Sequence, residues 1–389
     1  MRGCLSSVLC EEMARDLITL RRRLNSCPEV GFDLDGTLAI VEERLSGLGF
    51  ESRRVAGTGV SALLKGGGGG TVLLRADMDA LQMDDGAMHS CGHDLHTACL
   101  LGAAELLRDA ELLRDADRLP CDVLLVFQPA EETSGGALPM IEDGLLDGLD
   151  VRSAFALHCD PSLPARRVGV HRGVVRASSD MFDCVIKGRG THGAEPHRGD
   201  DVIAIACRTV DALMQLVGRT VDPVEPAVLS IGSFHAGNAR NALPGRAEFS
   251  GILRTLNDDT RVSLRAKVRR TVMNIPDILG ATGEVLFTEG YPSLVNDADM
   301  ADLVADAAVE LLGEEGLLPL TRPSMGVDDF AYFSRLVPAC YFMLGTGHGD
   351  GREEAPLHSP YFDPDERAIP IGAALLADLA LRSGRLYQK

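Results

Sequence analysis

The sequence lacks an excess of basic residues, long apolar runs and a regular cysteine framework. It contains 38 Lys and Arg against 57 Asp and Glu, a formal net charge of -19 at pH 7, which disfavours binding to phosphate backbones and anionic membranes. No uninterrupted apolar run approaches the ~18 to 20 residues of a membrane span. The 10 cysteines are scattered, as is typical of reduced thiols in a long chain. We therefore expect no nucleic-acid partner, no membrane insertion and no disulfide scaffold.

The N-terminal segment also lacks the pattern of a secretory signal peptide. In "MRGCLSSVLCEEMARD" one Arg and a brief apolar stretch precede acidic residues. This segment predicts a cytoplasmic protein. The length of 389 residues and the 45% hydrophobic content predict a globular chain of two domains.

Helical and β-rich patterns alternate along the first part of the chain. The spacing of apolar residues predicts helices over 11–24, 36–49, from about 94 to 116 and near 135–145, and strands over 71–76, 122–127 and 153–157. Such alternation predicts a largely parallel sheet covered by helices. The glycine run "KGGGGG" at 65–70 predicts a hairpin turn.

The pattern changes near residue 181. Strands are predicted over 181–188, 227–234, 247–255 and 284–290, with helices over 200–218 and 259–273. This βαββαβ order is that of a ferredoxin-like sandwich. We therefore predict an α/β catalytic domain, formed by residues 1–177 and 290–389, with an inserted α+β domain at 178–289.

Polar residues follow the predicted strands of the larger domain. In open α/β sheets, ligands bind beyond the carboxyl ends of the strands, so these residues are expected to face one site. Those at or near such ends, or at the start of the helix that follows, are Asp77, Asp79, Cys91, His93, Glu131, Glu132, His158 and His358.

The donor types in this set favour a transition metal over Mg²⁺ or Ca²⁺. Thiolate and imidazole suit Zn²⁺ or a similar ion, whereas Mg²⁺ and Ca²⁺ take oxygen ligands. Structural zinc sites use local Cys pairs, but these donors lie far apart in sequence. The spacing therefore indicates an open, catalytic site, where one of Glu131 and Glu132 would bind metal and the other act as general base.

Other readings of these residues stay open. Singly, the acidic residues fit turns or a helix start, and His158 and His358 fit packed or loop histidines. Five strand-end positions together favour a joint site. Cys91 could instead be a nucleophile with His93 as its base, but the two lie two residues apart without an obvious orienting partner.

Several ordered motifs carry a family resemblance. The chain resembles the amidohydrolase branch of the aminoacylase and carboxypeptidase family of dinuclear metallopeptidases, which includes hippurate, N-acyl-amino-acid and auxin-conjugate hydrolases. The resemblance extends from "RRRLNSCPEVGF" to the last helix. Its motifs are "LRADMDAL", "MHSCGHDLHTACLLGAA", "VFQPAEE", "MIEDGLL", "GTHGAEPH", "NARNALPG" and "LHSPYFDPDE".

The resemblance implies a site with two divalent metal ions per subunit, either Zn²⁺ or Mn²⁺. It makes Glu131 the general base and Asp79 the residue that orients the metal site. The Cys91 sulfur would bridge the two ions. The implied metal ligands are Cys91, His93, Glu132, His158 and His358.

The resemblance also assigns roles in the inserted domain. His192 and Asn241 match groups that approach the scissile carbonyl, and Arg254 matches an arginine that holds the substrate carboxylate. The inserted domain is expected to form a homodimer in which His192 and Asn241 serve the neighbour's site.

The implied activity is cleavage of N-acyl-L-amino acids, such as N-acetyl or N-benzoyl conjugates, to a carboxylate and a free amino acid. The alternatives are a dipeptidase or carboxypeptidase with the same site, and an inactive homologue that binds metal or ligand. The chain departs from the family pattern at Asn25, Gln82 and Asp328, and the segment between Met83 and Met88 is short. These departures concern substrate preference more than activity.

Overall fold

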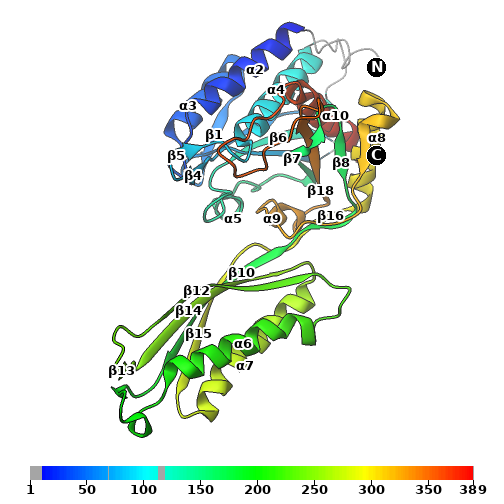
Figure 1. Ribbon diagram of the computed structural model, residues 1–389. Coiled ribbons are helices and arrows are strands. Elements are labelled where there is room, and N and C mark those ends of the chain that lie inside the picture. Colours follow the sequence, from blue (N-terminus) through cyan, green and yellow to red (C-terminus); the bar gives the residue numbers. More distant parts are fainter. Residues whose placement is uncertain (1–10, 69, 113–118, 389) are drawn as a thin grey trace. The chain divides into compact units, whose positions relative to one another are not determined.

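The computed structural model describes residues 11–68, 70–112 and 119–388. The described chain forms two compact units, one from residues up to 175 with 295–322 and 329–389, the other from 176–294 with 323–328 (Figure 1). Segment 323–328 therefore groups with the second unit, although the sequence-based boundaries place it in the catalytic domain. The prediction of a cytoplasmic protein was based on the N-terminal segment, of which residues 1–10 lie outside the described residues.

The first unit contains an eight-stranded, mostly parallel sheet, which confirms the predicted fold class. The order is β1-β2-β6-β3-β7-β18-β8-β17, and β3, β6, β7 and β18 run parallel. Every residue of β3 is buried, as expected for a strand covered on both faces. The strands are β1 (Ser52–Val55), β2 (Gly59–Leu64), β3 (Thr71–Asp77), β6 (Asp122–Gln128), β7 (Val151–Pro164), β8 (Val168–Val170), β17 (Leu317–Pro319) and β18 (Ala339–Gly347).

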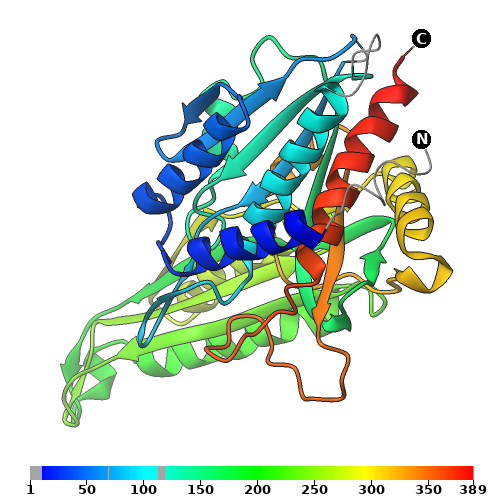
Figure 2. The same cartoon turned by 90° about the horizontal axis from the view of Figure 1, so that it is seen from above.

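Helices α2, α4 and α10 pack against one another in this unit (Figure 2). Their contact depends on Gly102, because a Cβ there would lie 2.7 Å from Leu17 and 2.8 Å from Ala373. The predicted helix ending near 116 is α4, and residues 113–118 lie outside the described part. The helices are α2 (Glu11–Asn25), α3 (Asp35–Gly47), α4 (His93–Leu112), α5 (Ala137–Glu142), α8 (Ala298–Leu312), α9 (Ala331–Ser334) and α10 (Ala368–Leu386).

Two local predictions for this unit were wrong. The glycine run at 65–70 does not form a hairpin, because β6 lies between β2 and β3 in the sheet; residue 69 is outside the described part. His158 lies inside β7, because the strand continues to Pro164. The remaining short elements are β4 (Leu81–Met83), β5 (Gly86–Met88), β9 (Gly173–Arg176), β16 (Leu294–Asn296) and the 3₁₀ turn Glu314–Gly316.

The second unit is the predicted ferredoxin-like sandwich. Its antiparallel sheet has the order β12-β14-β10-β15. Helices α6 and α7 share one apolar core with this sheet, in which Phe182 of β10 and Val268 of α7 are buried. The Asn257 side chain accepts two backbone N–H groups at the start of α7. The elements are β10 (Ser178–Lys187), β11 (Thr191–His192), the 3₁₀ turn Pro196–Arg198, α6 (Val202–Thr220), β12 (Ala227–Ala236), β13 (Ala242–Leu243), β14 (Arg246–Thr255), α7 (Asp258–Ile278) and β15 (Thr282–Glu289).

No helix in the described part of the chain is sufficiently long and apolar to span a membrane.

Candidate metal centre

The predicted donors of the first unit converge at one edge of its sheet. Cys91 and His93 lie at the start of α4, and His358 lies in the loop between β18 and α10. Groups of three whose ligand atoms all lie within 4.8 Å of one another include Cys91, His93 and His158, then Cys91, Glu132 and His358, and also His93, Glu131 and Glu132.

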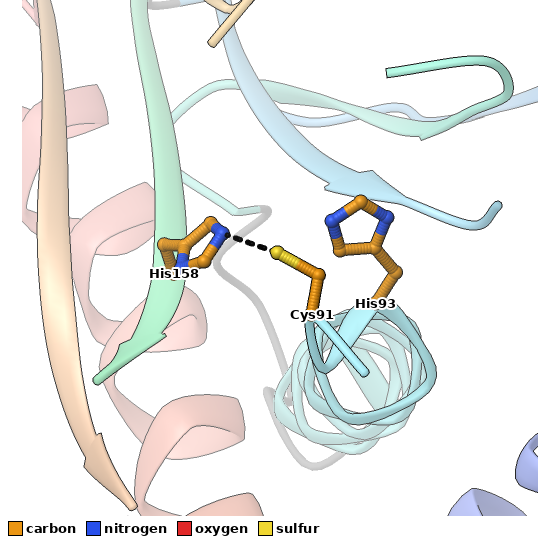
Figure 3. A group of neighbouring side chains, drawn as sticks. All are labelled: Cys91, His93 and His158. Atoms are coloured by element: carbon orange, nitrogen blue, oxygen red, sulfur yellow. Dashed lines mark hydrogen bonds between the residues drawn. The ribbon is translucent and has the colours of Figure 1, made fainter. Parts of the chain in front are cut away.

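The Cys91 sulfur lies at the junction of two of these groups. It is 3.5 Å from Nε2 of His158 and 3.3 Å from Nε2 of His358. Figure 3 shows the sulfur pointing between the rings of His93 and His158. The Cys91 sulfur therefore belongs to two donor groups at once.

Hydrogen bonds fix which ring nitrogen each histidine can offer. Nδ1 of His158 lies 2.8 Å from the carbonyl oxygen of Cys159, and since a carbonyl only accepts, Nδ1 carries the proton. The lone pair that a metal requires is therefore on Nε2 of His158. Nε2 of His93 has no hydrogen-bond partner among the described residues and lies 3.7 Å from the carboxylates of Asp77 and Glu132.

His96 is not available as a ligand, although it lies beside this cluster. The backbone N–H of Cys159 donates to its Nε2 at 2.8 Å, so that nitrogen is already an acceptor. Nδ1 of His96 donates to Asp77 at 2.6 Å. Both ring nitrogens of His96 are therefore engaged in hydrogen bonds. The role that fits this residue is to orient Asp77 and the backbone at Cys159. Its place one turn after His93 on α4 is the sequence signal for this role.

Asp79 holds the two adjacent glutamates. Its Oδ1 accepts the backbone N–H of Glu131 at 3.0 Å, and its Oδ2 accepts that of Glu132 at 3.1 Å. Oδ1 also lies 3.4 Å from Nδ1 of His93. The Asp79 carboxylate thus lies beside Nδ1, and Nε2 is on the opposite side of the His93 ring.

A buried polar network behind the site was not found from the sequence. Arg75, which is 1% exposed, donates to Asp77 at 2.7 Å, to Gln128 at 2.9 Å and to Asp329 at 2.8 Å. Burial raises the pKa of Asp77, but nearby His93 and Arg75 outweigh it and hold that pKa well below its usual range. An arginine inside the apolar strand "TVLLRAD" was the available signal, because a buried charge requires partners.

The donors fit a soft divalent cation. Burial raises the pKa of the Cys91 thiol well above its usual range, although His93 lowers it, and a coordinated cation stabilises the thiolate. Burial also raises the pKa of Glu132, but its interaction with His358 and the nearby His93 outweigh this effect and lower it. One thiol, imidazole nitrogens and a carboxylate are the donor set of Zn²⁺ and similar ions.

Comparison with known proteins identifies the family of this chain. Residues 73–382 match the model of "Peptidase family M20/M25/M40". The chain belongs to this family. Membership confirms the resemblance predicted from the motifs.

Relatives within the M20 family have different described activities. Thermostable carboxypeptidase 2 of Saccharolobus solfataricus is 36% identical, over 94% of this chain and 95% of the relative. N-acetyl-L-cysteine deacetylase of Bacillus subtilis is 34% identical, over 95% of this chain and 88% of the relative. The crystal structure of Bacillus subtilis YXEP, a dinuclear metal binding peptidase of the family, has a TM-score of 0.80 and 32% identity, over 96% of this chain and 99% of that one. This M20 protein is therefore a metal-binding hydrolase of amide bonds.

The positions that depart from the family pattern have defined surroundings. Asn25 donates to buried Asp94 at 2.8 Å, while Gln82 is exposed on β4 and donates to the Met83 carbonyl. Asp328 is buried. The short segment is a tight hairpin in which Met83 pairs with Gly86.

The remaining predicted residues lie in the second unit of this M20 protein. His192 and Asn241 are neighbours there, because β11 pairs with β13 and the N–H of Gly193 donates to the Asn241 carbonyl at 2.8 Å. Both side chains are exposed. Arg254 lies on β14.

Proposed function

We propose that this protein is a metal-dependent amidohydrolase that cleaves N-acyl-L-amino acids to a carboxylate and a free amino acid, with two divalent ions, Zn²⁺ or Mn²⁺, in each subunit. The observation that carries the proposal is the Cys91 sulfur shared by two donor groups, with Glu131 beside them. The proposed metal ligands are Cys91, His93, Glu132, His158 and His358. Because the donors come from distant segments, the site suits catalysis rather than a closed structural role.

Glu131 is the proposed general base. When bound, divalent ions supply Lewis acidity that polarises the amide carbonyl and lowers the pKa of water. The Glu131 residue is buried at 8% exposure, and its backbone is fixed by Asp79. Its carboxylate would accept a proton from the attacking water and return it to the leaving amine.

His192 is suited to donate a hydrogen bond. The backbone N–H of Ala194 donates to Nδ1 of His192 at 3.1 Å, so the proton of the neutral ring lies on Nε2. An exposed N–H on the inserted domain is a donor that a developing oxyanion would accept. We propose that His192, with Asn241 beside it, acts on the site of the neighbouring subunit in a homodimer formed by this domain.

The proposed dimer predicts complementation between inactive variants. Glu131→Ala and His192→Ala should each nearly silence their own homodimer. After subunit exchange, about half of the dimers pair one of each, and a single intact site in those returns about a quarter of wild-type activity by statistical pairing. Activity of mixed and unmixed samples measures this. If the mixture stays as inactive as its parents after exchange is verified, His192 does not act in trans.

Arg254 is the proposed anchor of the substrate carboxylate. Its guanidinium donates to the Met325 carbonyl at 3.1 Å, and burial lowers the pKa of this side chain. Among the described residues, no acidic side chain forms an ion pair with it. A partly desolvated guanidinium without an acidic partner favours a bidentate carboxylate ligand.

Arg254→Ala is therefore expected to slow carboxylate-bearing substrates selectively. The loss should be roughly 10²-fold in kcat/KM, since a charged hydrogen bond contributes about 1.5–3 kcal/mol. The control is the matched amide substrate in which the carboxylate is replaced by a carboxamide. An equal loss for both substrates would show that Arg254 does not bind the carboxylate.

Peptide cleavage by the same site is the second candidate, favoured by the carboxypeptidase relative. A peptide differs from an N-acyl amino acid mainly in its free amine. A panel of N-acetyl, N-benzoyl and indole-acetyl amino acids beside dipeptides, assayed with Zn²⁺, Mn²⁺ or Co²⁺, decides between them. Preference for dipeptides would overturn the proposed substrate class, and no turnover of any substrate would indicate a binding homologue. Action on small soluble substrates accords with the cytoplasmic location that we propose.

A further inference from the structure

The loop that carries His358 holds this residue in an unfavourable conformation. The loop joins β18 to α10 (Figure 2), and His358 has φ of 64°. Few non-glycine residues adopt this left-handed region, and those that do are usually held there by their surroundings. The His358 N–H donates to the Ser90 carbonyl at 2.8 Å, but its side chain is 52% exposed. The rest of the loop must therefore contribute to its position.

Charged side chains surround the start and end of this loop. A cavity of about 620 Å³ lies there, lined mainly by charged side chains of α2 and of the loop, including Arg22, His348 and Asp363. Nearer to His358, Leu357 and Phe362 pack against the hydrophobic core of the unit, so polar contacts act mainly on the start and end of the loop.

His348 makes the central contacts. Its backbone N–H donates to Oε1 of Glu354 at 2.6 Å, and its Nδ1 donates to Oε2 of the same carboxylate at 3.2 Å. The carbonyl of His348 accepts from Arg367 at 3.4 Å. Glu354 precedes His358 by four residues, so His348 ties the segment leading to His358 to the end of β18.

A contact on the other side of His358 is weaker. Nε2 of His348 lies 3.7 Å from Asp363, whose side chain is 74% exposed. An exposed ion pair at this distance contributes little. The pair of His348 and Glu354 is better shielded, with side-chain exposures of 19% and 21%.

We propose that His348, acting through Glu354, is a positioning residue for His358 in the metal centre. The inference rests on the proposed function, because His358 is assigned there as a metal ligand. Loss of the His348 side chain should lower the affinity for the ion proposed to bind Cys91, Glu132 and His358. The affinity for the ion proposed to bind Cys91, His93 and His158 should stay unchanged.

Zn²⁺ binding to the metal-free full-length protein, measured by competition with a chromophoric chelator, tests this proposal. His358→Ala and His158→Ala first identify the binding step that belongs to each group. His348→Ala should then weaken the His358-dependent step by roughly tenfold, the lower end of losses seen when a ligand's supporting contact is removed. His348→Asn should restore most of the affinity, because its amide N–H can reach Glu354.

Two further variants separate positioning from general destabilisation. Glu354→Ala should weaken the same step, and adding His348→Ala to it should weaken binding no further, since the two residues act as one pair. Arg22→Gln is the matched control, because it removes an exposed ion pair to Glu366 at the same cavity and should change neither step.

Unchanged Zn²⁺ binding in His348→Ala, equal weakening of both steps, or additive effects of the two substitutions would each overturn the proposal. A wild-type protein that binds fewer than two Zn²⁺ ions would instead overturn the metal centre itself. That failure appears before any His348 variant is compared, so the two failures are distinguishable.

Discussion

Glu131→Gln is expected to retain both metal ions and to lose turnover by roughly 10²- to 10⁴-fold, the usual contribution of a positioned general base. Glutamine keeps the size and a hydrogen-bonding oxygen but cannot accept the proton of a water. The backbone of residue 131 would still donate to Asp79. Metal content and kcat of the purified variant measure the two effects separately.

Glu132→Gln is the matched comparison, because the two glutamates are adjacent and their backbone N–H groups both donate to the Asp79 carboxylate. The Glu132 carboxylate lies 3.2 Å from His358 and 3.7 Å from His93. Its neutral replacement should therefore lose metal as well as activity. Equal metal depletion in both variants would remove the distinction between base and ligand.

Exhaustive chelation is expected to abolish activity, and added Zn²⁺ or Mn²⁺ to restore it. The reason is that Cys91 is proposed as a ligand, with its sulfur between two imidazole nitrogens. Bound metal should also slow alkylation of Cys91, since a coordinated sulfur is a weaker nucleophile and the residue is 6% exposed. Activity and the rate of alkylation are measured on the same samples before and after metal removal.

The cysteine-hydrolase alternative predicts the opposite results. A nucleophilic Cys91 would form a trapped acyl-enzyme, detectable by mass, and would keep full activity after chelation. The geometry around Cys91 does not favour this chemistry. Nε2 of His93 lies 3.7 Å from the carboxylates of Asp77 and Glu132, an arrangement suited to a shared cation.

The chain's departures from the family pattern are predicted to concern substrate preference. Gln82 lies on the short hairpin that immediately precedes the metal-binding segment, and its side chain is exposed. The side-chain amide of Asn25 donates a hydrogen bond to the carboxylate of Asp94. Neither position contributes a proposed metal ligand.

The sequence by itself was sufficient to predict the order of the main elements and the residues that converge in the candidate site. Alternating patterns are local properties, so the parallel sheet and the βαββαβ insert could be read from segments of ten to twenty residues. Candidate donors such as His93 and Glu132 could be proposed because residues at strand ends meet at one edge of an α/β sheet. Their chemistry depends on residue type, which the sequence states directly.

Only the tertiary structure decided which atoms these residues offer. His96 and His158 are both histidines near Cys91, but the backbone of Cys159 occupies Nε2 of the first and Nδ1 of the second. The partners of Arg75 include Asp329, which is 254 positions away, and His348 contacts Glu354 within an irregular loop. Periodicity carries no information about such pairs, because a hydrogen bond depends on the directions of two groups after the chain has packed.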